Sequence, residues 1–211
     1  MKFEEVVHII PEVSFKELPG EPAHNRIMNK EVRQKIFQNY GHQHPYKESA
    51  VIALLYPGPQ QQAQMLFILR KSYDGHHSGQ IAFPGGKKEP EDLSLRETAL
   101  RETFEEVGVK PNEIEIVKKL SEVFIPVSNY LVQPYLAVAQ QTPLFIKDPV
   151  EVEEILEFDL GKILNNPLVK LQKNYFNQPY EIYAFQIDSY QIWGATAMIL
   201  AEVRSLFGYS L

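Results

Sequence analysis

Residues 81–108 read "IAFPGGKKEPEDLSLRETALRETFEEVG" and hold the strongest structural signals of the chain. A short apolar segment is interrupted by a Pro-Gly-Gly run, and paired glycines let the backbone approach a ligand or an ion closely. Ser94 and Glu97 have the spacing of a capping box, which predicts that a helix begins near residue 95. Gly108 is a typical helix stop, so we expect a helix over about residues 95–107.

Three acidic residues crowd the last turns of this predicted helix. Glu105 and Glu106 follow Glu102 at i+3 and i+4, so the three carboxylates share one neighbourhood. Acids in the last turn also oppose the helix dipole, and two carboxylates about 5 Å apart repel by roughly 3 kcal/mol at an effective dielectric of about 20. The apolar residues have the spacing of one buried face: Leu100, Phe104 and Val107.

Divalent cations would relieve the repulsion among these acids. Carboxylate oxygens suit Mg²⁺ or Mn²⁺, and both ions also bind phosphate groups. Arg101 lies four residues after Glu97 and four before Glu105, so it can join the acidic patch by ion pairs. The alternative is a solvated acidic helix, and the glycine pair just upstream favours a binding site over it.

The overall composition is that of an ordinary globular chain. Of its 211 residues, 44% are hydrophobic and 23% are charged, and the net charge is −6. An acidic chain argues against a general nucleic-acid surface or an anionic-membrane surface. The chain contains no cysteine, which excludes disulfides and cysteine chemistry and fits a cytoplasmic location. Its longest strongly apolar run, residues 192–201, is about half a membrane span.

The rest of the chain has the pattern of a mixed sheet with helices on its faces. Two strand-forming runs flank a polar segment at residues 57–64, which predicts a hairpin. Further strands are expected at residues 114–120, 131–139, 153–160, 180–187 and 190–193, and the last two would close the sheet. Residues 195–207 predict an amphipathic C-terminal helix. Because strands and helices do not alternate regularly, we expect an α/β fold with a mixed sheet and not a series of βαβ units.

Residues 1–47 are expected to form an N-terminal extension that packs on a domain formed by residues 48–211. The extension mixes prolines and charges with one amphipathic stretch, residues 29–40, which predicts a helix. The only tryptophan, Trp193, is expected to anchor the core and not to stack on a substrate.

The acidic helix and its glycines resemble the Nudix hydrolase family. The motif of that family is G-x5-E-x7-R-E-U-x-E-E-x-G-U, where U is a bulky apolar residue. Here Gly86 opens the motif and residues 101–109, "RETFEEVGV", close it. Asp92 stands at the place of the first Glu, with eight residues in place of seven before Arg101, and Thr103 replaces a bulky apolar residue.

These departures resemble the coenzyme A pyrophosphatase branch of the family, whose box reads "FPGG…D…D.S…TALRE..EE". Residues 83–106, "FPGGKKEPEDLSLRETALRETFEE", follow that box with Glu89 in place of its first Asp. The branch also has an upstream motif, L-L-T-x-R-[SA]-x3-R-x3-G-x3-F-P-G-G, which Arg70 and Gly79 match at the proper spacing. The resemblance extends from about residue 48 to the C-terminus.

The resemblance implies an α/β/α sandwich around a mixed sheet and a metal-dependent hydrolysis of a nucleoside diphosphate derivative. For coenzyme A, the products would be 4′-phosphopantetheine and adenosine 3′,5′-bisphosphate. The groups that it assigns to Mg²⁺ or Mn²⁺ are the backbone carbonyl of Gly85 and the carboxylates of Glu102, Glu105 and Glu106. Arg101 would orient these carboxylates, and Asp92 would hold Arg101.

The general base is expected in residues 148–158, "DPVEVEEILEF", where Glu151 or Glu153 would act as the base or as a fourth metal ligand. The densest cationic stretch, residues 70–80, is expected to contact substrate phosphate. Its two histidines, His76 and His77, have an exposed polar loop as the alternative interpretation. The residues expected to bind substrate are Arg70, Lys71, Gly79, Phe83 and Lys87.

Other substrates stay open because two residues depart from the upstream motif. Gly75 replaces its second Arg, and Lys71 replaces its small residue. The alternative substrates are ADP-ribose, NADH or a nucleotide sugar. A further alternative is a non-catalytic nucleotide-binding module, but such modules commonly lose box glutamates, and all three are present here. The expected partner is thus a small nucleotide, with no nucleic acid and no membrane, and a homodimer is compatible with the sequence.

Overall fold

A computed structural model describes residues 1–40, 45–71, 79–175 and 178–209. Its main sheet has eight strands, with the order β3-β2-β1-β7-β5 and with β4, β6 and β8 paired to β1, β7 and β2. The strands are β1 (Lys47–Pro57), β2 (Ala63–Arg70), β3 (Ile81–Ala82), β4 (Gly85–Lys87), β5 (Glu115–Lys119), β6 (Val123–Ile125), β7 (Tyr130–Val138) and β8 (Val152–Asp159). Strands β1 and β7 are parallel and β1 and β2 form the predicted antiparallel hairpin, so the sheet is mixed, as expected.

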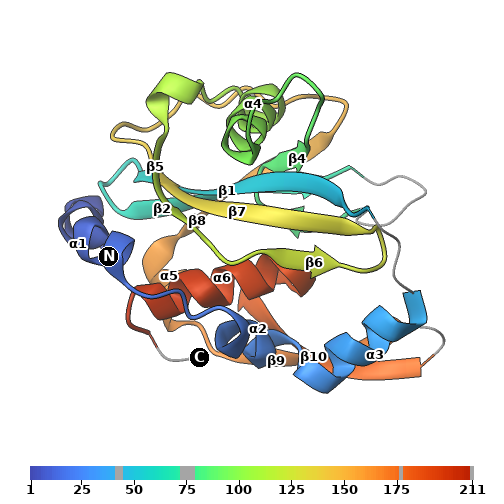
Figure 1. The fold of residues 1–211 in the computed structure, drawn as a ribbon. Helices are drawn as coiled ribbons and strands as arrows, with labels where there is room; N and C mark the ends of the chain where they lie inside the picture. The colour runs from blue at the N-terminus through green and yellow to red at the C-terminus, as the bar shows by residue number, and fades with distance from the viewer. Residues whose placement is uncertain (41–44, 72–78, 176–177, 210–211) are drawn as a thin grey trace.

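Helices cover both faces of this sheet (Figure 1). Helix α4 (Leu95–Val107) lies on one face and α6 (Gly194–Leu206) on the other. The remaining helices are α1 (Phe3–Phe15), α2 (Glu21–Ile27), α3 (Lys30–Tyr40), α5 (Leu160–Asn165) and the 3₁₀ turn η1 (Pro111–Glu113). Because both faces are covered, the central strand β1 is buried almost throughout, which explains its nearly continuous apolar sequence.

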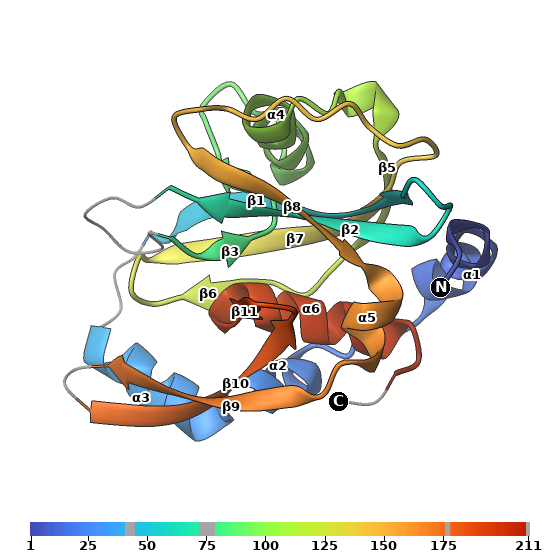
Figure 2. The same cartoon turned by 180° about the vertical axis from the view of Figure 1, so that it is seen from behind.

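The C-terminal strands form a second sheet. Strands β9 (Leu168–Tyr175), β10 (Gln178–Ile187) and β11 (Tyr190–Ile192) make a three-stranded antiparallel sheet with the order β11-β10-β9. The prediction that residues 180–187 and 190–193 close the main sheet is therefore wrong. Figure 2 shows the reason: α5 follows β8 and leads the chain to the far side of α6, where β9 begins.

Helix α4 begins and ends where its caps predict. The Ser94 hydroxyl oxygen accepts a hydrogen bond from the Glu97 N–H at 3.2 Å, and Gly108 adopts the left-handed conformation with φ 78°. The expected buried face is only partly correct, because Phe104 is 47% exposed while Thr103 and Glu106 are buried. Helical spacing shows that an apolar arc exists, but it does not show which edge of the arc faces the sheet.

The predicted C-terminal helix is confirmed as α6, and polar side chains of this helix are buried as well as apolar ones. Glu202 and Arg204 are buried together with Leu200 and its neighbours. The N-terminal helices contribute Phe3, Val6 and Ile27 to the same apolar cluster. Helix α3 corresponds to the helix predicted at residues 29–40, and the domain boundary at residue 47 stays a prediction. Among the described residues, no helix is both long and apolar enough to cross a membrane.

Candidate active site

Strand β4 places two glycines against the acidic end of α4. Gly85 has φ 144°, and a Cβ atom there would lie 2.2 Å from the backbone oxygen of Ala50. A Cβ atom on Gly86 would lie 2.4 Å from Oε2 of Glu102. Only residues without a side chain leave room for this approach, and it lets the Gly85 N–H donate to Oε2 of Glu106 at 2.8 Å.

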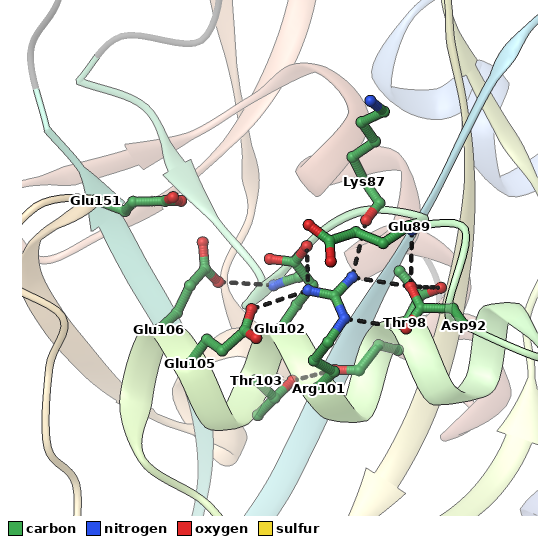
Figure 3. A network of polar contacts seen from close by, with 12 residues as sticks. Lys87, Glu89, Asp92, Thr98, Arg101, Glu102, Thr103, Glu105, Glu106 and Glu151 are labelled. Carbon is green, nitrogen blue, oxygen red and sulfur yellow. Dashed lines mark hydrogen bonds and ion pairs between the residues drawn. The ribbon is translucent and has the colours of Figure 1, made fainter.

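Arg101 is the centre of a polar network on the exposed side of α4 (Figure 3). Its Nε and Nη2 donate to the two carboxylate oxygens of Asp92, at 3.0 and 2.9 Å. Its Nη1 donates to Glu102 at 3.0 Å and to Glu105 at 2.8 Å, and Nη2 also reaches the carbonyl of Lys87 at 3.0 Å. The predicted Asp92–Arg101 pair is therefore present as a bidentate ion pair.

Asp92 is itself held by two further donors. The Thr98 hydroxyl and the Glu89 N–H each donate to its Oδ2 at 2.9 Å. The hydrogen bonds from Arg101, assisted by these two donors, hold the pKa of Asp92 well below its usual range despite its burial. Sequence reasoning missed Thr98, although its position four residues after the N-cap Ser94 could have suggested that it faces the segment before the helix.

The three glutamates of α4 differ in their surroundings. The Glu106 side chain is 3% exposed and accepts from Arg70 Nη1 at 3.3 Å. Burial raises the pKa of Glu106 to about 8, although the Gly85 N–H and Arg70 oppose the rise. Burial also raises the pKa of Glu102, against the effect of Arg101, whereas the Glu105 side chain is 53% exposed.

The segment that follows β7 binds the C-terminal end of α4 and brings a fourth carboxylate to it. The Ile146 N–H donates to the carbonyl of Val107 and the Asp148 N–H to that of Glu106, both at 2.9 Å. The Asp148 carboxylate in turn accepts from the Glu151 N–H at 3.2 Å. These bonds satisfy helix-end carbonyls and lead the chain directly to residue 151.

Of the two candidate bases, only Glu151 is brought to this network. Its carboxylate lies 3.8 Å from Arg70 Nη2. Glu151 and Glu102 both border a cavity beside the acidic end of α4. In Figure 3 Glu151 points toward the acidic end of α4 from the side opposite Asp92. The Glu153 side chain is exposed on β8 and is not part of that cavity wall.

Three of the predicted substrate-binding residues border the same cavity. Arg70 faces Glu106 and Glu151, so its charge is shared between two acids. Lys87 uses its carbonyl for Arg101, while its exposed side chain extends away from the carboxylates in Figure 3. Phe83 is 2% exposed and stacks on Phe67 with ring centroids 4.7 Å apart, so most of it belongs to the core.

Lys71 and Gly79 lie at the two ends of a segment outside the described residues. The Lys71 N–H donates to the carbonyl of Glu151 at 3.0 Å, and the Gly79 N–H donates to that of Lys71 at 3.4 Å. Neither Lys71 nor Gly79 is among the described residues that border the cavity. Gly75, His76 and His77 fall within residues 72–78 and lie outside the described residues.

The chemistry of the donor set suits a hard divalent cation. Five carboxylates, those of Asp92, Glu102, Glu105, Glu106 and Glu151, face the guanidinium groups of Arg70 and Arg101. Acid is therefore in excess of the two guanidinium groups, and burial is the main cause of the raised pKa of Glu106. Within the part of the chain that the structure describes, no three acidic or histidine side chains are close enough together to hold a metal ion as they stand. The carboxylates are bound instead to the arginines and to the Gly85 N–H.

Comparison with known proteins agrees with this combination of fold and site. Residues 46–178 match the NUDIX domain family, and the chain belongs to this family. Members of the family generally use divalent metal ions and act on small nucleotide-derived substrates. The box resemblance of residues 86–109 is thereby confirmed at the level of the family.

Relatives with curated names are similar over about three quarters of the chain. Nudix hydrolase 15, mitochondrial, of Arabidopsis thaliana is 30% identical over 76% of this chain and 58% of its own length. The peroxisomal coenzyme A diphosphatase ndx-8 of Caenorhabditis elegans is 29% identical over 74% of this chain and 67% of its own length. The chain thus spans little more than half of the Arabidopsis relative.

Solved structures show the same fold at low sequence identity. A Nudix hydrolase from M. smegmatis, RenU, aligns with a TM-score of 0.54 and 15% identity, over 77% of this chain and 86% of that one. The MutT protein from Methanosarcina mazei Go1 aligns with a TM-score of 0.52 and 17% identity, over 81% of this chain and all of that one. Both confirm the expected sandwich around a mixed sheet.

Proposed function

We propose that the chain is a metal-dependent pyrophosphohydrolase that cleaves the diphosphate of coenzyme A or a derivative. The products would be 4′-phosphopantetheine and adenosine 3′,5′-bisphosphate. One observation carries the proposal: Glu102 at the acidic end of α4, the two glycines of β4 and Glu151 border one cavity, and Glu106 binds the Gly85 N–H beside it. The family match and the relatives named as Nudix hydrolases support this reaction class.

In the proposed site, Glu102, Glu105 and Glu106, with the carbonyl of Gly85, would hold Mg²⁺ or Mn²⁺. Such an ion would neutralise phosphate charge and make a water molecule easier to deprotonate. Arg101 positions Glu102 and Glu105, because its guanidinium is fixed between them and Asp92.

The remaining roles belong to the groups opposite α4. Glu151 is the proposed general base because it borders the cavity beside Arg70, the partner of Glu106, whereas Glu153 does not border the cavity. Arg70 would move from its acidic partners toward substrate phosphate, since a guanidinium matches the geometry of phosphate oxygens.

Two observations support coenzyme A within this reaction class. The box of residues 83–106 resembles the coenzyme A branch, and Asp92, which marks that branch, holds Arg101. A relative at 29% identity is named a coenzyme A diphosphatase. That relative is named peroxisomal and another mitochondrial, so the cytoplasmic location stays a proposal, as does a homodimer.

Gly75 favours a second candidate, hydrolysis of ADP-ribose, NADH or a nucleotide sugar. It removes a cation that the coenzyme A branch carries at this point of its upstream motif. A substrate without the 3′-phosphate of coenzyme A would not need that charge.

A substrate panel with product identification tests the proposal. The purified chain is assayed with Mg²⁺ or Mn²⁺ on coenzyme A, 3′-dephospho-coenzyme A and ADP-ribose. We expect coenzyme A to have the highest kcat/KM and to yield 4′-phosphopantetheine. Equal rates on the first two substrates would remove the argument for 3′-phosphate recognition, and a preference for ADP-ribose would favour the second candidate.

A further inference from the structure

The cavity at the acidic cluster is much longer than a diphosphate site requires. Its volume is about 980 Å³, near the upper end for small-molecule sites. It begins at Glu102, Glu151 and Gly86 and continues past the main sheet to Phe37 on α3 and Trp193 before α6. In Figures 1 and 2, α3 lies below the main sheet, on the side of its strand β6.

The far part of this cavity has walls that the family match does not include. That match covers residues 46–178, whereas Met28, Phe37 and Trp193 come from outside it. Phe124 on β6 and Tyr175 at the end of β9 are also part of the aromatic lining. Helices α2 and α3 therefore add a wall to the site instead of only covering the core.

Two aromatic rings of this far part have close neighbours on the cavity wall or beside it. Phe37 meets Phe124 edge to face, with ring centroids 5.3 Å apart and planes at 77°. Lys173 Nζ lies 4.1 Å from the ring centroid of Trp193 and covers one face of that ring.

Two cations of the far part, Lys30 and Arg33, have polar partners. Arg33 Nη1 donates to the side-chain oxygen of Asn25 at 3.1 Å, and Lys30 Nζ lies 3.5 Å from a carboxylate oxygen of Glu21. A phosphate at this end would have to compete with these partners. In contrast, Ser49 on the cavity wall has a buried hydroxyl that has no hydrogen-bond partner in the described structure, so a neutral polar group can be accommodated.

We propose that the far part of the cavity binds the non-nucleotide arm of the substrate, and that this arm is long and makes mostly apolar contacts with the aromatic lining. An amide-bearing chain such as pantetheine has this chemistry, whereas the compact polyhydroxylated ribose of ADP-ribose does not reach the aromatic lining. Phe37, Tyr175 and Trp193 determine specificity for the arm. This inference rests on the proposed function for the position of the diphosphate, and it adds the N-terminal helices to the substrate site.

A pair of substrates that share ADP and differ only in the arm tests the inference. Phe37→Ala should raise the KM for 3′-dephospho-coenzyme A about tenfold and change kcat little, because the lost contact does not touch the reacting phosphates. Its KM for ADP-ribose should stay unchanged. Tyr175→Ala, at the end of β9, should have the same selective effect. Phe15→Ala is the matched control, since Phe15 is 89% exposed on α1 and outside the cavity.

Binding of 4′-phosphopantetheine, measured by isothermal titration calorimetry, gives a readout without turnover. The wild type should bind it, and Phe37→Ala, with an unchanged circular dichroism spectrum, should bind about tenfold more weakly. If the wild type hydrolyses neither substrate but shows this difference in binding, the proposed function fails and the arm site stands. Equal losses on both substrates, no loss on either, or no binding of 4′-phosphopantetheine to the wild type would each overturn the inference.

Discussion

Each acid at the end of α4 is compensated in a different way. Glu105 is exposed and paired with Arg101, Glu102 is mostly covered and shares that arginine, and Glu106 is buried against the Gly85 N–H. This division explains how one short helix tolerates acids that its dipole and their mutual repulsion disfavour. It also leaves excess negative charge, which is the basis for the proposed cation site.

The first prediction concerns Asp92, which holds Arg101 in position and is not itself proposed to bind metal or substrate. In Asp92→Asn, an amide replaces a carboxylate oxygen that accepts from Arg101, so the arginine is held less firmly. We expect the free energy of unfolding to fall by about 2 kcal/mol and kcat to fall about tenfold or more. Urea denaturation and turnover measure these changes, with the exposed neighbour Glu91→Gln as control. Unchanged kcat in Asp92→Asn would show that Arg101 does not depend on this anchor.

The sequence predicted the contacts between residues that are close together along the chain, on or just before helix α4. Glu102, Glu105 and Glu106 share one end of α4, and the expected Asp92–Arg101 pair is present. The pairing of Arg70 with Glu106 joins residues 36 positions apart, and no local period relates them. Such contacts depend on which strand lies beside the helix, so the sequence predicted Arg70 only as a substrate contact.

Among the elements, the segment from β7 to β8 acts as a tether for the proposed base. Its bonds to the end of α4 hold Glu151 at the cavity, while Glu153 lies two residues further along the exposed edge of β8. We expect Glu151→Gln to lower kcat about 100-fold or more, in the range of general-base catalysis, and Glu153→Gln to leave it nearly unchanged. Steady-state kinetics of the two variants decide between them, and a larger loss in Glu153→Gln would contradict the assignment.

Helices α2 and α6 are joined by a buried carboxylate. Glu202 is fully buried and accepts from the N–H and hydroxyl of Ser121, at 3.1 and 2.7 Å, and from the Gly20 N–H at 3.2 Å. His24 Nε2 on α2 lies 3.5 Å from it. Burial alone would raise the pKa of Glu202, but the nearby His24 and the hydrogen bonds from Ser121 together outweigh burial and lower it.

This lowered pKa predicts how stability changes with pH. The folded pKa lies below the unfolded value of 4.5, so the contribution of Glu202 is fully present above 4.5 and is lost as pH falls through the folded pKa. Glu202→Gln should lower the free energy of unfolding by about 2 kcal/mol at neutral pH, and the difference from wild type should shrink toward about pH 3. Urea unfolding at several pH values measures it. A difference that stays constant over this range would contradict the lowered pKa.

Local signals predicted the elements that carry their own caps, whereas tertiary pairing decided the rest. Helix α4 has a hydroxyl cap at Ser94 and a left-handed Gly108, and both act within a few residues. Strands β10 and β11 were predicted as strands but assigned to the wrong sheet, because alternation in a sequence does not specify a partner. Strand β9, with half-buried alternation and several charges, was not predicted at all.

For the whole molecule, the N-terminal helices share the main apolar cluster. Val6 on α1 is fully buried in it, whereas the adjacent Val7 is 38% exposed. We expect Val6→Ala to lower the free energy of unfolding by about 2 kcal/mol and to shift one single transition, and Val7→Ala to have little effect. Denaturation followed by both tryptophan fluorescence and circular dichroism checks this. Two separate transitions would indicate that residues 1–47 unfold independently.

The most direct test of the central claim is the metal-dependent turnover of Glu105→Gln and Glu106→Gln. The wild type should lose activity in a chelator and regain it with Mg²⁺ or Mn²⁺. Each variant should keep its fold and lose about 100-fold or more in kcat/KM at saturating metal, while the exposed Glu115→Gln on β5 should match the wild type. Near-normal turnover in both variants would contradict the assignment of the acidic end of α4 as the catalytic cation site.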